Sequence, residues 1–177
     1  MNTTKWVLDP THSEVNFKIK HMMISNVTGS FTNFNVTAET DEDDFLKSKI
    51  SFTTEVNSIN TNNEQRDGHL KSADFFDTEK YPHITFNASK FEKAANNEYA
   101  LHGNLTIRDV TKPVQLNVDF GGIAKDPYGN IKAGFTLDGK INRKDFGLTW
   151  NAATEAGGVL VGEDLKIQAE IQLVKQA

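Results

Sequence analysis

Apolar and polar residues alternate with a period of two along most of the chain, whereas the 3.6-residue period of an amphipathic helix is nearly absent. Alternation of this kind is typical of β-strands that bury one face and leave the other in water. It predicts eight long strands and a short leading strand near Trp6 to Leu8. The long strands are expected at 15–23, 27–40, 49–57, 83–92, 99–108, 113–122, 131–142 and 164–174.

The alternation changes parity once, within the second predicted strand. Phe31 falls on one face of 27–40, whereas Phe34 and the apolar residues after it fall on the other. A β-bulge inserts one extra residue and so reverses the face that later residues occupy. We therefore expect a bulge at Thr32 and Asn33.

One apolar face on each strand, without helices to cover a second face, leaves two all-β architectures: a closed barrel or a face-to-face sandwich. The length of 177 residues suits a single domain spanning 1–177. Pairing of consecutive strands favours an eight-stranded, antiparallel up-and-down barrel. Such a barrel is about 25 Å tall, and its interior is just wide enough for side chains or one slim ligand. A sandwich with a filled core, acting as a ligand-free interaction module, remains the alternative.

In an up-and-down barrel, alternate connections lie at the same end. The connections after the first, third, fifth and seventh strands are rich in cationic side chains, whereas the other end receives the acidic residues 41–44. We therefore expect the two ends to differ in charge. The cationic end is expected to carry His21, Arg66, Arg108, Lys112, Arg143 and Lys144.

The two longest links, 58–82 and 143–163, both belong to the cationic end. They exceed ordinary hairpin loops, so we expect them to fold over the mouth of the barrel. Thr61 and Glu64 have the spacing of a capping box, which predicts a short helix from about Asn62 to Ala73.

Composition narrows the function classes. The formal net charge of −5 and the isoelectric point near 5.5 disfavour a nucleic-acid or anionic-membrane surface as the main role. The chain has no cysteine, which excludes disulfides and thiolate catalysis. No apolar run approaches the roughly 18 residues of a membrane-spanning helix, and the N-terminus has no signal-peptide core, so we expect no membrane insertion. The expected location is cytoplasmic, or periplasmic if a leader has been removed.

The histidines give no sign of metal or triad chemistry. The five histidines match no metal-ligand spacing, and Ser13 beside His12 lacks the other parts of a catalytic triad. The sequence therefore predicts no metal, no cofactor and no catalytic residue. His21 lies on an apolar face, either as a hydrogen-bonded core residue or as a contact for the polar group of a ligand.

Several long blocks follow one another in a specific order: WVLDPTHSEVNFKIKH, GSF, SINTNN, RDGHLKSADFFD, KYPHITF, GNLTIRDVTKPV and INRKDFGL. Together they extend over almost the whole chain and resemble the YceI-like family of lipocalin-like barrels. The resemblance implies an extended eight-stranded barrel that holds an isoprenoid or another long apolar chain in its lumen, often as a homodimer and without established catalysis. Asp109 stands where the family usually has glycine, and aspartate tolerates the same turn conformations.

An apolar tunnel is sufficient to bind such a chain. Burying a methylene group is worth roughly 0.8 kcal/mol, so one isoprene unit contributes about 4 kcal/mol before ordering costs. We expect chain length and slimness to set specificity. The residues expected to contact the ligand are Phe17, Ile19, His21, Met23, Phe52, Phe86, Leu105, Ile107, Phe135, Leu137 and Ile167.

Three interpretations of Arg66 and His69 at the mouth remain open. Arg66 braces the helix through a carboxylate such as Asp74 or Asp145, or both residues hold an anionic head group, or His69 is the general base of an enzyme that hydrolyses a lipid ester or a polyprenyl pyrophosphate. Helical spacing separates Asp67 from His69, which disfavours the third. We therefore expect a non-enzymatic protein that carries, stores or sequesters a lipid. The head-group or lid residues are expected to be Arg66, His69, Phe75, Phe76, Arg143 and Trp150.

Overall fold

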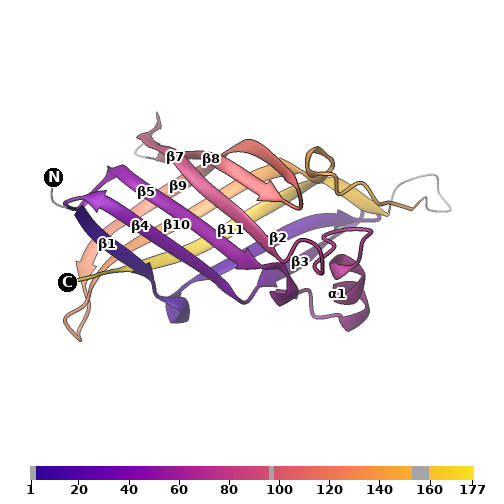
Figure 1. Cartoon of the computed structure of the whole chain (residues 1–177), viewed down its shortest axis with the longest axis horizontal. Helices are drawn as coiled ribbons and strands as arrows, with labels where there is room; N and C mark the ends of the chain where they lie inside the picture. The colour runs from indigo at the N-terminus through magenta and orange to yellow at the C-terminus, as the bar shows by residue number, and fades with distance from the viewer. Residues whose placement is uncertain (1–2, 96–97, 153–159) are drawn as a thin grey trace.

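The structure is a computed structural model that describes residues 3–95, 98–152 and 160–177 (Figure 1). It is built almost entirely of strands, with one α-helix and a few short 3-10 turns. The strands are β1 (Thr3–Leu8), β2 (Glu14–His21), β3 (Ser25–Phe31), β4 (Phe34–Asp41), β5 (Asp44–Glu55), β6 (Ile59–Asn60), β7 (His83–Lys93), β8 (Tyr99–Ile107), β9 (Val110–Lys125), β10 (Ile131–Asn142) and β11 (Val161–Lys175). The helix is α1 (Glu64–Lys71), and the 3-10 turns are η1 (Pro10–His12), η2 (Val56–Ser58) and η4 (Arg143–Phe146).

The strands form one sheet that closes into a barrel. Its order is β1-β4-β5-β7-β8-β9-β10-β11-β2-β3-β6, and a further pairing joins β1 to β11. Both β1 and β2 pair with β11, at Leu8 opposite Leu173 and at Glu14 opposite Glu170, so they form one interrupted wall strand. β3 with β4, and β5 with β6, continue one another in the same way. The predicted closed, eight-stranded antiparallel barrel is confirmed.

Both chain termini lie at one end of the barrel, and α1 lies near the other (Figure 1). The end with the termini is filled by aromatic side chains. Phe45 lies 4.9 Å from Trp6 and 5.1 Å from Phe135, measured between ring centroids, and Phe120 stacks on Phe135 at 4.9 Å. The Trp6 indole N–H donates to the Thr40 hydroxyl at 3.0 Å, which satisfies its polar group in this buried place. This end of the interior is therefore occupied by protein.

The first two wall strands are interrupted at the same height. β1 and β4 are paired as far as Val7 opposite Thr37, and β2 and β3 are paired from Val15 opposite Phe31. Between these pairs the first wall strand contains η1 and the second contains the bend at 32–33, and this fully described stretch has no ladder pairing between them. The backbone ladder of the wall is locally open there.

The parity change in the second wall strand is a break, and the predicted bulge was wrong. Thr32 N donates to Ser58 O at 3.2 Å, and Asn33 O accepts from Glu55 N at 3.0 Å. Both residues thus bond to the chain around η2 and lie outside β3 and β4. The two-residue interruption lets the strand resume with the opposite set of residues facing inward.

α1 is shorter than predicted, and a different residue caps it. The side chain of Asn63 accepts from Arg66 N at 3.0 Å, so Asn63 is the N-cap. Thr61, expected in a capping box, instead donates through its backbone N–H and its hydroxyl to Asp67. Of the helices within the described ranges, none is long and apolar enough to cross a membrane.

Asp9 anchors the interruption in the first wall strand. Its carboxylate accepts from Lys132 Nζ of β10 at 2.6 Å and from Thr11 N of η1 at 3.1 Å, and it lies 2.8 Å from His12 Nδ1. The side chains of Asp9 and Lys132 are 11% and 19% exposed. The hydrogen bond from Lys132 holds the pKa of Asp9 far below its usual range, and the same bond raises the pKa of Lys132.

Replacing Asp9 by asparagine is expected to lower the free energy of unfolding by about 1 to 2 kcal/mol at pH 7, because Lys132 loses a partly buried ionic partner. The pKa of Asp9 is lower in the folded than in the unfolded state. Asp9 therefore contributes its full stabilisation above the unfolded pKa of about 4, and this stabilisation is lost as the pH falls toward the folded-state pKa. Urea unfolding at pH 7 and at pH 2 measures both effects. The gap between wild type and Asp9→Asn should narrow at pH 2, and an unchanged gap would contradict this account.

Candidate ligand-binding site

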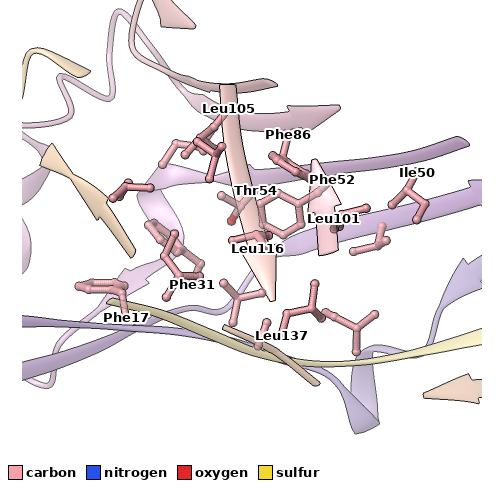
Figure 2. A pocket seen from close by; sticks show the side chains of 18 of the residues that line it. Phe17, Phe31, Ile50, Phe52, Thr54, Phe86, Leu101, Leu105, Leu116 and Leu137 are labelled. Carbon is pink, nitrogen blue, oxygen red and sulfur yellow. The ribbon is translucent and has the colours of Figure 1, made fainter. Parts of the chain in front are cut away.

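A cavity of about 180 Å³ lies inside the barrel and is lined by 26 residues. Figure 2 shows side chains from several strands, among them Phe52, Phe86 and Leu137, arranged around this space. It forms because inward-facing residues alternate along every wall strand. Of the residues predicted to contact a ligand, those that line it are Phe17, Phe52, Phe86, Leu105, Ile107, Phe135, Leu137 and Ile167.

The cavity is apolar on all sides. Among its lining residues, all of them described, Asn16 and Thr54 alone have polar side chains. The Thr54 hydroxyl is already committed, because it donates to Asn33 O at 2.9 Å. Away from Asn16, which lies at the edge of this space, a polar ligand group would lose its water without gaining partners, which is costly. The lumen is therefore suited to an apolar chain.

Two of the lining phenylalanines lie against glycines of the neighbouring strand. Phe17 is opposite Gly29, and a Cβ atom at Gly29 would collide with the Phe17 ring. A Cβ at Gly103 would lie 2.6 Å from Phe86 Cζ and 2.6 Å from the Asn87 carbonyl oxygen. Glycine at these two positions lets the rings lie close to the wall, which leaves the centre of the lumen open.

Three residues predicted to contact the ligand do not line the cavity. Ile19 and His21 are half-buried near the end of β2, and Met23 is 58% exposed in the β2–β3 turn, where its φ angle is 61°. Ile19, expected in the lining, thus lies outside it, and ligand contact by Ile19, His21 and Met23 stays a prediction. The alternation was extended through 15–23 although the strand ends at His21, and the cavity does not reach that far along β2.

Other lining residues were not named as ligand contacts although their positions were informative. Leu101 shares the inward face of β8 with the predicted contacts Leu105 and Ile107, and Leu116 alternates with Val114 and Val118 on β9, so the period of two already identified both. Phe31 could not be assigned in this way, because the parity change lies directly after it.

The described parts of the two long links meet at the α1 end of the barrel. Phe76, from the chain after α1, lines the cavity and lies edge-on to Phe31 at 6.4 Å. Trp150, from the other link, lies 4.5 Å from the His69 ring and 5.4 Å from Phe75. These aromatic contacts place the side chains of both links at the mouth, while residues 153–159 of the second link lie outside the described residues.

Arg143 is 2% exposed and holds the second link in place. Its guanidinium donates to four carbonyl oxygens, those of Leu148 at 2.6 Å, Gly162 at 2.7 Å, Trp150 at 2.9 Å and Val161 at 3.2 Å. Burial lowers the pKa of Arg143 from its ordinary value. The donors of this arginine are therefore directed at the backbone of its own link.

Arg66 and Asp67 together hold Thr61. Arg66 donates from Nε to the Thr61 hydroxyl at 2.8 Å and from Nη2 to Thr61 O at 2.7 Å. The carboxylate partners considered for Arg66, Asp74 and Asp145, are not the ones it bonds. Its partner is instead Thr61, a buried residue just before the helix. No feature of the sequence shows that Arg66 bonds to this threonine and not to a carboxylate.

His69 pairs with Asp74, which had been considered as a partner for Arg66. His69 Nε2 lies 2.9 Å from Asp74 Oδ2, and the two side chains are 37% and 53% exposed. Among the described residues, no group of three or more His, Cys, Asp or Glu side chains is arranged to hold a metal ion. The His69 ring also lies edge-on to Phe75 and Trp150. The pair therefore holds the end of α1 next to these aromatic side chains.

Comparison with known proteins places this architecture in a family. The sequence model of the YceI-like domain matches residues 6–173. The chain belongs to the YceI-like family. Its curated relatives include UPF0312 proteins from several strains of Staphylococcus aureus, such as N315 and MW2, which are 41% identical over 170 residues and are matched over 96% of either chain.

Several solved structures share the fold of this chain. The YceI protein of Campylobacter jejuni has 37% identity and a TM-score of 0.76, with coverage of 96% of this chain and 97% of that one. BcnA of Burkholderia cenocepacia has 22% identity and a TM-score of 0.78, covering 93% and 98%. A polyisoprenoid binding domain from Saccharophagus degradans has 16% identity and a TM-score of 0.66, covering 97% and 98%. The latter two show the shared fold.

Replacing Arg143 by methionine is expected to lower the free energy of unfolding by about 2 to 4 kcal/mol, because buried carbonyl oxygens lose their donors. The adjacent Lys144 provides a matched control. It pairs with Glu163 at 2.8 Å on an exposed surface, so Lys144→Met should cost under about 1 kcal/mol. Urea denaturation measures both variants, and similar losses would show that the carbonyl contacts of Arg143 do not stabilise the link.

Proposed function

We propose that the protein binds one slender lipid chain, isoprenoid or fatty, in the barrel lumen without transforming it, and so carries, stores or sequesters it. The observation that carries the proposal is the cavity enclosed by an almost wholly apolar lining within a closed barrel. Membership of the YceI-like family and the structural similarity to the polyisoprenoid binding domain of Saccharophagus degradans support the same ligand class.

Cavity size favours a thin chain over a bulky ligand. The volume of about 180 Å³ is below the roughly 300 to 1,000 Å³ of pockets that enclose drug-sized molecules. Each buried methylene group contributes roughly 0.8 kcal/mol, so a chain of a few isoprene units binds without a polar contact. A longer chain requires lining side chains such as Phe52 and Phe76 to rotate.

Phe75, Phe76 and Trp150 serve in this proposal as the lid of the lumen, and Arg66, His69 and Arg143 brace it. The contacts of Arg66 with Thr61, of His69 with Asp74 and of Arg143 with four carbonyls support bracing over binding of an anionic head group. The expected homodimer and cytoplasmic location stay predictions.

Filling the lumen is expected to block binding. Ala169 on β11 is buried and lines the cavity, whereas Lys166 on the same strand is exposed and lies outside both hollows. Ala169→Trp should lower the affinity for farnesol at least about tenfold, since the ring occupies the space of the chain, at a stability cost of about 1 to 3 kcal/mol. Lys166→Trp adds the same ring outside the barrel and should change affinity less than about twofold.

Titration calorimetry measures these affinities, and urea unfolding verifies that both variants are folded. Equal affinities for the two variants would contradict a ligand in the lumen. Incubation of the wild-type protein with farnesyl pyrophosphate and with a fatty ester should leave both compounds intact, and turnover would contradict a non-enzymatic role.

A further inference from the structure

A second hollow, of about 310 Å³, lies where the first two wall strands are interrupted. Its lining includes Pro10 from η1 and Thr32 and Asn33 from the break between β3 and β4. The backbone ladder is open at this place, because the pairing of β1 with β4 stops before it and the pairing of β2 with β3 starts after it. We call this hollow the side-wall vestibule.

The side-wall vestibule adjoins the lumen. Val15, Asn16 and Phe31 line both hollows. The two hollows therefore share this part of the wall. Phe31 also contacts Phe17 at 5.5 Å and Phe76 at 6.4 Å, so its ring belongs to the aromatic lining of the lumen.

The side-wall vestibule offers free hydrogen-bonding groups from Asn16, which also borders the lumen, and from Ser30. Asn16 and Ser30 lie opposite each other on β2 and β3, and both are half-buried. Neither side chain forms a hydrogen bond with any residue in the described ranges, whereas the hydroxyl of Ser13 is bonded to Gln172. An amide and a hydroxyl together can donate to and accept from a ligand.

The charges around the side-wall vestibule disfavour an anion. The carboxylate-bearing Glu14 contributes to its lining, and the lining, which is described throughout, contains no lysine or arginine. Of the cationic side chains at the mouth, Arg143 bonds to four carbonyls and Arg66 to Thr61. The end with the chain termini is filled by the cluster around Phe45.

We propose that the side-wall vestibule holds the polar end of the ligand, that this end is a small uncharged group such as a hydroxyl, phenol or carbonyl, and that the apolar chain passes beside Phe31 into the lumen. This inference rests on the proposed function and adds to it the position and chemical class of the head group. Asn16 and Ser30 are the residues assigned to contact it.

The first test compares three probes of equal chain length: farnesol, farnesyl pyrophosphate and the hydrocarbon farnesene. Asn16→Leu should lower the affinity for farnesol about 5- to 10-fold, which corresponds to the loss of one hydrogen bond. It should change the affinity for farnesene less than about twofold. Asn26→Leu is the control, because Asn26 is an exposed asparagine on β3 away from the vestibule. It should affect neither probe.

If Asn16→Leu lowers the affinities for farnesol and for farnesene equally, the assignment of Asn16 to the head group is overturned. Tighter binding of farnesyl pyrophosphate than of farnesol, abolished by Arg66→Met, would place the head group at the mouth and overturn it as well. If wild-type protein binds none of the three probes, the proposed function itself fails, and this inference fails with it.

A second measurement locates the head group without relying on Asn16. The chain has no cysteine, so Ser30→Cys and Ser25→Cys each introduce a single thiol on β3, one in the vestibule and one near the mouth. Farnesol should slow alkylation of the thiol at position 30 at least about threefold, farnesene should slow it less, and position 25 should react at an unchanged rate. Protection at position 25 instead would contradict the proposal.

Discussion

The pairing of β1 with β11 is the interaction on which the rest of the structure depends. It joins the two ends of the sheet, so that residues of alternate parity on every wall strand face a closed interior. Without it β1 and β11 would be separated there, and the apolar faces along both would meet water. Trp6 lies within this pairing and packs on Phe45, so closure of the wall and filling of one end are achieved by the same short strand.

Closure also explains why the interior and the mouth have different chemistry. The lumen is lined by side chains that need no partners, whereas the links at the α1 end carry charged groups that find partners locally. The stretch from Arg66 to Phe76 illustrates this, since its charged residues bond to Thr61 and Asp74 and its last phenylalanine lines the cavity. The charged residues that cluster in this stretch of the sequence therefore stabilise the chain next to an apolar site.

The period of two was sufficient to predict the strands and eight of the residues that line the cavity, because the side-chain direction in a strand follows from the backbone alone. It left a barrel and a sandwich open, and the pairing of consecutive strands and the family resemblance favoured the barrel. Prediction failed where the chain leaves the ladder. Met23 falls in a turn, Asn63 replaces Thr61 as the helix cap, and the break at 32–33 replaces a bulge. The partner of Arg66 was also missed, since a hydrogen-bond partner depends on which segments the folded chain brings together.

Extraction of the purified protein with organic solvent, followed by mass spectrometry of the extract, tests the central claim most directly. The account predicts a single-chain apolar lipid in about equimolar amount, or, from a protein purified empty, uptake of one added chain per barrel. Ala169→Trp should yield little or none under the same conditions. A protein that releases no lipid and takes up no added chain would show that the lumen is only a core, and would contradict the account.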